Sequence, residues 1–268
     1  MILQFRNIFR RNTVPESILF FTTHKSASMF IYSVCKELSE KAGLNYLSSN
    51  ESIDRRDIDD PANWIEDGAC IAPVRAMPRG IDSSVLDNYK IILHLRDPRD
   101  VLTSMFFSYC FIHSGEEAVN TGMRKEVSEK GIDAFVIKVS TDKVPIMLYG
   151  TGDETTILSR YQDYISMLLG RKNVTLVHYE EMVSDFRSWI TRVSQPFILK
   201  DSTKVIDALC LKYEGSFKPR SVQNGEEVLL DHKRKVTPGD YLDKLKPETI
   251  EKLNTIYKDI LEKLGYKI

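Results

Sequence analysis

The chain has 268 residues, of which 42% are hydrophobic and 28% are charged, a balance typical of a folded globular protein. Its formal net charge is −1, so no overall positive field attracts nucleic acid, and any anionic ligand must be held by a local group of cations. No apolar stretch is long enough to span a membrane, and residues 1–12 lack the apolar core of a signal peptide. We therefore expect one domain over residues 1–268, located in the cytoplasm, with no integral membrane segment.

The spacing of cysteine and histidine gives no sign of a metal site. The four cysteines are scattered and form no CxxC pair, and the five histidines stand at unrelated spacings. Cys35 lies on an apolar helical face, and Cys70 and Cys210 lie in apolar runs, so the sequence favours buried free thiols over disulfides. We expect a protein that works without a metal ion.

The most informative stretch runs from a buried strand through a short polar loop into a helix. Residues 18–21 are all apolar, as in a strand covered on both faces, and residues 22–28 are small and polar except for Lys25. The helix is indicated by an apolar face of Ile31, Val34, Cys35 and Leu38. Because loop amides, a helix N-terminus and a lysine meet there, the stretch predicts an anion site. The alternative is an ordinary turn with a solvated lysine.

Strands and helices alternate along the rest of the chain. Further strands are predicted at residues 44–47, 69–74, 91–95 and 174–177. Helices are predicted after Asp97, at 161–169 and at 247–264, and we expect the last to pack on the sheet. This alternation predicts an α/β fold with a parallel central sheet flanked by helices, and a ligand site outside the carboxyl ends of the strands.

Three segments match the motifs of one known family in the same order. Residues 24–30, HKSASMF, are similar to a loop usually written PKSGTTW. Arg96 at a strand end and Ser104 eight positions later have the spacing of a pair that holds a nucleotide 3′-phosphate. Residues 234–241, RKVTPGDY, are similar to a loop written RKGxxGDW. On these segments the chain resembles the sulfotransferases.

The resemblance implies a P-loop-NTPase-like, three-layer α/β/α sulfotransferase fold that uses no metal. The donor would be 3′-phosphoadenosine 5′-phosphosulfate (PAPS) and the product 3′-phosphoadenosine 5′-phosphate (PAP), with a hydroxyl or amine of a small-molecule, lipid or carbohydrate as acceptor. Lys25 would neutralise charge on the leaving phosphate oxygen. The donor-binding residues implied beside Lys25 are Ser26, Ala27, Ser28, Met29, Phe30, Arg96, Ser104, Tyr179, Ser216, Phe217, Arg234 and Lys235.

One departure from the family concerns the general base. Cytosolic sulfotransferases carry a basic histidine two residues before a proline that corresponds to Pro78, and Ala76 stands there in this chain. Glu51 lies in the segment that supplies a glutamate base in some carbohydrate-modifying sulfotransferases, and His24 lies in the lysine loop. We rank Glu51 first as the base, His24 second and His113 third.

Two other functions stay open at this point. A protein that binds PAPS or PAP but has impaired turnover would explain Ala76, and a P-loop kinase-like phosphotransferase would share the sheet and the lysine loop. The kinase alternative lacks the glycines of a Walker A loop. Residues 110–158 are rich in glycine and are either a mobile lid over the acceptor or a surface excursion. The acceptor's identity and the oligomeric state do not follow from the sequence.

Overall fold

The protein is built on a five-stranded parallel sheet. The computed structural model describes residues 15–48, 60–64, 67–108, 121–142, 156–213, 215–217, 222–223, 226–227 and 236–268. The strands, in their spatial order, are β2 (Asn45–Leu47), β3 (Ala69–Val74), β1 (Ile18–Thr22), β4 (Lys90–Leu95) and β5 (Val174–His178). All five predicted strands are confirmed. A separate antiparallel pair consists of β6 (Val222–Gln223) and β7 (Glu226–Glu227).

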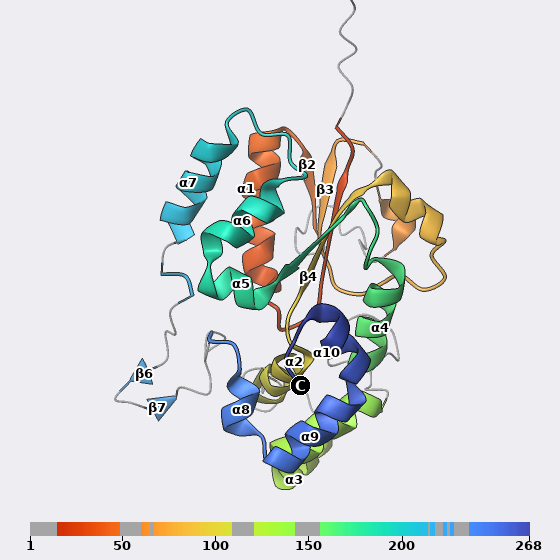
Figure 1. The fold of residues 1–268 in the computed structure, drawn as a ribbon, viewed down its shortest axis with the longest axis vertical. Coiled ribbons are helices and arrows are strands. Elements are labelled where there is room, and N and C mark those ends of the chain that lie inside the picture. The colour runs from red at the N-terminus through yellow and green to blue at the C-terminus, as the bar shows by residue number, and fades with distance from the viewer. Residues whose placement is uncertain are drawn as a thin grey trace, which may run out of the picture.

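Helices cover both faces of the sheet, as the unbroken apolar run of β1 predicts (Figure 1). Ile18 and Phe20 pack with one layer of helices, and Leu19 and Phe21 pack with the other. The first layer consists of α1 (Ser28–Ala42), α5 (Tyr179–Ser184), α6 (Phe186–Ser194) and α7 (Ser202–Tyr213). The second cluster includes α2 (Pro98–Phe107), α3 (Thr121–Thr141), α4 (Ile157–Met167), α9 (Pro247–Ile256) and α10 (Lys258–Leu264).

The chain ends in two helices where one was predicted over residues 247–264. Helix α9 stops at Tyr257, whose φ of −99° and ψ of 10° are not helical, and α10 begins at the next residue. Tyr257 is fully buried and its ring meets that of Tyr161. The two helices pack on α3 and α4, and their buried residues share the core cluster of that face of the sheet (Figure 1). The break lets each short apolar face meet a different neighbour.

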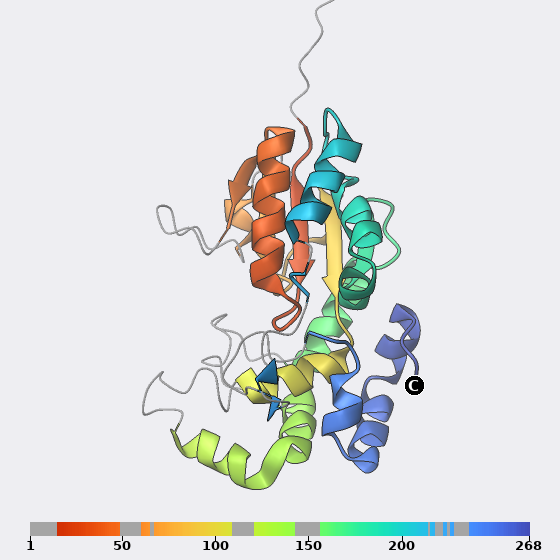
Figure 2. The same cartoon turned by 90° about the vertical axis from the view of Figure 1, so that its left-hand side faces the viewer.

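The described part of residues 110–158 is more regular than the sequence suggests. It contains the 21-residue helix α3, which bends at Gly131, a residue with φ of 78° and ψ of 176° (Figure 2). Glycine allows this backbone conformation without a steric penalty. Residues 109–120 and 143–155 lie outside the described part of the chain, so the lid stays a prediction.

The cysteines that the structure describes are free thiols and form no disulfide with one another. Cys35 and Cys70 are buried and Cys210 is half-buried, and all three are free thiols. Cys110 lies outside the described ranges. Within those ranges no three His, Cys, Asp or Glu side chains gather as a metal site, and no helix has the length and apolar character needed to cross a membrane.

One titratable side chain is sealed inside this core. His94 of β4 is fully buried, and its ring packs against those of Phe20 and Trp189 at centroid distances of 6.2 Å and 5.7 Å. Burial, followed by the charges of His178 and Arg96, lowers the pKa of His94 to about 3. The folded protein therefore holds a neutral imidazole, whereas the unfolded chain protonates it below about pH 6.5.

We expect His94 to make the fold acid-sensitive. Since the unfolded state binds the proton first, stability falls as the pH drops from about 6.5 toward 3, and by about 2 kcal/mol between pH 7 and pH 5. Urea unfolding at those two pH values should show a smaller loss for His94→Gln than for the parent protein. Equal losses in both proteins would show that His94 is not the titrating group.

Candidate active site

The loop after β1 has an unusual backbone. Lys25 and Ala27 adopt left-handed φ angles of 65° and 61°, which are uncommon for residues other than glycine and cost about 1 to 3 kcal/mol each. Two contacts hold the loop in place: Thr23 Oγ1 and Ser26 Oγ lie 2.6 Å apart, and Arg96 donates to the Lys25 carbonyl at 2.9 Å. Turns of this kind bring backbone N–H groups together as anion-binding concavities.

Helix α1 starts directly behind this loop. Ala27 is its N-cap residue, and no acidic side chain lies in its first turn to neutralise the positive end of the helix. Of the predicted loop residues, Ser26 is buried, Lys25, Ala27 and Ser28 are half-buried, and the Met29 side chain is 61% exposed. The structure thus places Lys25 and the start of α1 at one spot, while the side chain of Met29 faces solvent.

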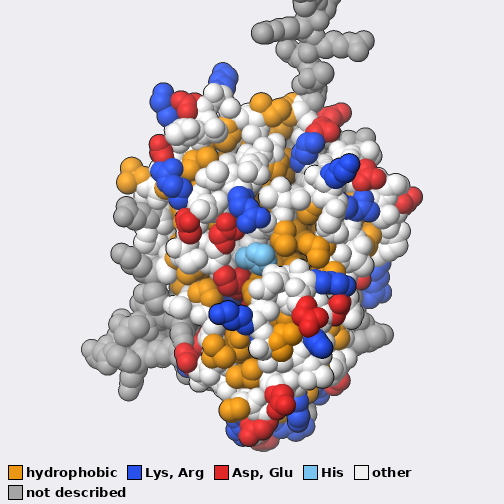
Figure 3. Space-filling view, in the orientation of Figure 1, with side chains coloured by type: hydrophobic (Ala, Val, Ile, Leu, Met, Phe, Trp, Pro, Cys, Tyr) orange, Lys and Arg blue, Asp and Glu red, His pale blue; other side chains and the backbone are white. Residues whose placement is uncertain are grey.

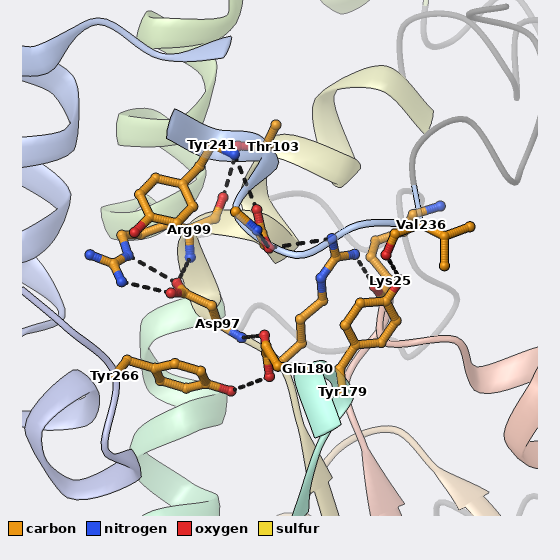
Figure 4. Close-up of polar contacts among 12 residues, drawn as sticks. Lys25, Asp97, Arg99, Thr103, Tyr179, Glu180, Val236, Tyr241 and Tyr266 are labelled. Atoms are coloured by element: carbon orange, nitrogen blue, oxygen red, sulfur yellow. Dashed lines mark hydrogen bonds and ion pairs between the residues drawn. The ribbon is translucent and has the colours of Figure 1, made fainter. Parts of the chain in front are cut away.

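Arg96 joins this loop to the end of β4. Its side chain is almost fully buried, with Nη1 on the Lys25 carbonyl and Nη2 at 3.5 Å from Asp100 Oδ2 (Figure 4). Its guanidinium carbon lies 4.3 Å from the centroid of the Tyr179 ring, a cation–π contact. The Arg96 Nε is buried and has no hydrogen-bond partner in the part of the chain that the structure describes.

Asp100 connects the same group to the segment that precedes α8 (Asp240–Lys244). Its carboxylate accepts from the amides of Gly239 at 2.8 Å and Tyr241 at 3.1 Å (Figure 4). Gly239 has a φ of 86°, which favours glycine at this position. The Tyr179 hydroxyl donates to the Val236 carbonyl at 2.8 Å. Residues 236–241 are therefore fixed beside Arg96.

The remaining predicted 3′-phosphate residues adjoin this group as far as the structure describes them. Ser104 is half-buried and follows Asp100 by one turn of α2, so both lie on the same side of the helix. Arg234 and Lys235 immediately precede the fixed segment in the sequence, but they lie outside the described residues. The structure thus brings together Lys25, Arg96 and residues 236–241, which directly follow the predicted basic pair.

Aromatic rings gather around the first turn of α1. The Phe30 ring contacts those of Tyr213 and Phe217 edge to face, each at a centroid distance of 4.9 Å, and Phe186 and Trp189 complete the group. Phe30 and Phe217, both among the predicted donor-binding residues, are thereby neighbours. Ser216 is half-buried in the turn before Phe217. Aromatic rings in contact at the end of a sheet are suited to stacking with a nucleobase.

His24 lies among cations. Burial, and then the charges of Arg160, Arg75 and Lys25, hold the pKa of His24 well below its ordinary value. Ala76, which follows β3, is also buried. Glu51 and His113, the other predicted bases, lie outside the described residues. Arg75 and Arg160 were not predicted, because they come from distant parts of the chain, the segment after β3 and helix α4.

The hydrogen bonds made by Arg99 and Glu180 were not predicted either. Arg99 binds both oxygens of Asp97, at 3.0 Å and 2.6 Å, and donates to Asn254 and to the Lys267 carbonyl at 2.6 Å and 2.8 Å. Glu180 accepts from the Asp97 amide and from the Tyr266 hydroxyl, both at 3.0 Å (Figure 4). The sequence RDPRD is a visible signal of alternating charge, but it does not name these distant partners.

The family of the chain follows from a domain match. The family model for the sulfotransferase domain matches residues 15–265. The chain belongs to the sulfotransferase family. No curated protein sequence matches the chain.

Solved structures show the same fold. The mouse sulfotransferase SULT7A1 complexed with PAP aligns with a TM-score of 0.61 and 16% identity over 92% of this chain and 84% of that chain. Retinol dehydratase complexed with androsterone and inactive cofactor PAP aligns with a TM-score of 0.58 and 16% identity over 98% and 85% of the two chains. Its complex with retinol and PAP aligns with a TM-score of 0.56 and 14% identity over 98% and 86%. The predicted three-layer sulfotransferase fold is confirmed.

The surface of this sulfotransferase carries no broad charged patch on the face seen in Figure 3, where acidic and basic side chains are intermixed. This pattern agrees with the net charge of −1. An anionic ligand must therefore be held by the local cations at the carboxyl ends of the strands.

We expect Asp100 to determine the order of residues 236–241. Asp100→Asn removes the charge and turns an NH2 group toward one of two amides, leaving a buried donor without an acceptor at a cost of about 2 kcal/mol. Hydrogen exchange of the Gly239 and Tyr241 amides should become faster. Asp243→Asn, an exposed change in the same region, is the matched control and should leave both amides protected. Unchanged exchange in Asp100→Asn would contradict this role.

Proposed function

We propose that this sulfotransferase transfers the sulfuryl group of PAPS to a hydroxyl or amine of an acceptor and releases PAP. The observation that carries the proposal is the hydrogen bond from Arg96 to the Lys25 carbonyl. It joins, at the ends of adjacent strands, one cation suited to a 5′-phosphosulfate and another suited to a 3′-phosphate. The neighbours solved with PAP, retinol and androsterone support a nucleotide donor and a small-molecule acceptor.

The residues present fit such a donor. Lys25 and the left-handed loop provide a cation and converging amides, and the buried Arg96 Nε retains an unused donor. Phe30 and Phe217 offer aromatic faces near the start of α1. Ser104, Tyr179, Ser216, Arg234 and Lys235 are proposed to complete the binding site.

The reaction breaks the bond from sulfur to the bridging phosphate oxygen of PAPS, forms a bond from sulfur to the acceptor atom, and releases the acceptor's proton. Lys25 stabilises the negative charge that grows on the leaving phosphate oxygen. The amides of the loop orient the sulfate group, and Arg96 holds the nucleotide in register with Lys25. The protein thus acts mainly through positioning and charge.

A general base must take the proton that the acceptor releases. Glu51 is the first proposed base and His24 the second, with His113 third. The lowered pKa of His24 keeps its imidazole unprotonated at neutral pH, so the ring is able to accept a hydrogen bond from the acceptor. The nearby cations make a protonated His24 unfavourable, which supports Glu51 as the residue that takes the proton.

We expect Lys25→Ala to lower the rate of PAP release from PAPS by about 100- to 1000-fold. Alanine keeps the carbonyl that Arg96 binds and carries the same left-handed strain as lysine, so the midpoint of thermal unfolding should change little. Lys25→Met, which keeps the length of the side chain without its charge, should show the same loss of rate. Lys41→Ala, an exposed change at the far end of α1, is the matched control. A fully active Lys25 variant would rule out the catalytic role.

A second test concerns the 3′-phosphate. PAP and AMP differ only in that group, so titration calorimetry should show PAP binding about 100-fold more tightly, because charge-assisted hydrogen bonds contribute about 1.5 to 3 kcal/mol each. Arg96→Ala should bring the two affinities close together, and Ser104→Ala should reduce the ratio less. AMP serves as the internal control for the integrity of each variant's nucleotide site. Equal affinities for PAP and AMP in the parent protein would refute the assignment.

A further inference from the structure

The peptide group that joins Arg96 to Asp97 is held by side chains at both of its polar atoms. It stands where β4 has ended, and Asp97 is the N-cap residue of α2. Its carbonyl, that of Arg96, accepts from the Tyr161 hydroxyl at 2.5 Å, and its N–H, that of Asp97, donates to Glu180 Oε1 at 3.0 Å. Since the N–H of an N-cap residue has no partner within its own helix, these two side chains set the orientation of the peptide.

The orientation of this peptide decides where the Arg96 guanidinium lies. Arg96 is almost fully buried, and its side chain leaves the backbone directly beside the held carbonyl. Its Nη1 donates to the Lys25 carbonyl at 2.9 Å, and its guanidinium carbon lies 4.3 Å from the centroid of the Tyr179 ring. A tilt of the peptide would move the guanidinium, and a displacement of about 1 Å in a binding group can cost an enzyme about 100-fold in rate.

Glu180 is held in turn by Tyr266. Glu180 lies in the first turn of α5, and its second oxygen, Oε2, accepts from the Tyr266 hydroxyl at 3.0 Å, as Figure 4 shows. Burial raises the pKa of this carboxyl group, while the hydrogen bonds from Asp97 and Tyr266 act in the opposite direction. The Tyr266 hydroxyl therefore stabilises the ionised carboxylate that accepts from the Asp97 amide.

Tyr266 is itself fixed in position. Its amide donates to the Leu261 carbonyl at 2.8 Å, across Gly265, whose φ of 76° closes α10. Its ring meets that of His178, the last residue of β5, at a centroid distance of 5.5 Å. Contacts of both its main chain and its ring thus aim the Tyr266 hydroxyl at Glu180.

We propose that Tyr266 and Glu180 are positioning residues for the selection of a 3′-phosphate by this sulfotransferase. Tyr266 orients the Glu180 carboxylate, the carboxylate orients the peptide between Arg96 and Asp97, and the peptide presents the Arg96 guanidinium to the nucleotide. The inference rests on the proposed function, since that function assigns the 3′-phosphate to Arg96. It extends the donor-binding machinery to the segment after α10, which matches none of the sequence motifs.

The test removes a single hydroxyl and measures nucleotide selectivity by titration calorimetry. In Tyr266→Phe the ratio of PAP affinity to AMP affinity should fall about tenfold, because the contact of Arg96 with the 3′-phosphate is weakened, while AMP affinity stays within about twofold of the parent value. Tyr46→Phe is the matched control. It removes a hydroxyl that donates to the Ala72 carbonyl at 2.9 Å in the sheet, and it should keep the parent's ratio.

A second pair of variants separates position from charge. Glu180→Gln keeps an oxygen for the Asp97 amide and offers an NH2 group to the Tyr266 hydroxyl, so it should retain most of the parent's ratio. Glu180→Ala keeps neither contact and should lose at least as much of the ratio as Tyr266→Phe. Both changes remove the same charge, so equal ratios in the two Glu180 variants would overturn the positioning role.

Failure of this inference and failure of the proposed function give different results. A merely structural Tyr266 would lower the midpoint of thermal unfolding in Tyr266→Phe and leave the ratio unchanged. A parent-like ratio in that variant therefore overturns the inference, while the assignment of the 3′-phosphate to Arg96 stands. If the parent protein binds PAP and AMP equally, or binds neither, the proposed function itself fails.

Discussion

The candidate site depends on the burial of one guanidinium group. Arg96 is almost removed from water, and its two terminal nitrogens find acceptors that come from parts of the chain that are far apart in sequence. The Lys25 carbonyl belongs to the loop after β1, Asp100 belongs to α2, and Tyr179 is the first residue of α5. Asp100 and Tyr179 make further contacts, to the amides of Gly239 and Tyr241 and to the Val236 carbonyl. Satisfying one buried cation therefore aligns the lysine loop, the helix beside it and the segment before α8.

A second arginine supports the first from behind. Arg99 lies three residues after Arg96, but it turns away from the site to bind Asp97, Asn254 and the Lys267 carbonyl. This arrangement ties the C-terminal helices to the start of α2. The position of Arg96 is consequently fixed by packing on both sides, which is the kind of support that a site acting through positioning requires.

The sequence predicted the sheet, the lysine loop and the start of α2 because each has a local cause: a buried apolar run, a cluster of small polar residues, and an Asp-Pro cap. It could not predict the left-handed conformations of Lys25 and Ala27, since neither residue type favours them and only tertiary contacts hold them. It also missed the first turn of α4, where the capping box uses Ser159 in place of the usual Glu or Gln. That turn carries Arg160. The loss of helical conformation at Tyr257 likewise follows from tertiary packing rather than from any local break in the apolar pattern.

The absence of a histidine at position 76 is best understood through the cations that surround the neighbouring loop. Burial, and then the charges of Arg160, Arg75 and Lys25, disfavour a positive charge on His24 and lower its pKa. The same field acts on any hydroxyl bound beside His24, and there it lowers the pKa, because the deprotonated form is the negative one. An acceptor that ionises more readily needs less help from a general base. We therefore infer that Lys25, Arg75 and Arg160 would stabilise a developing oxyanion and so reduce the demand on the proposed base, where Ala76 stands in place of a histidine.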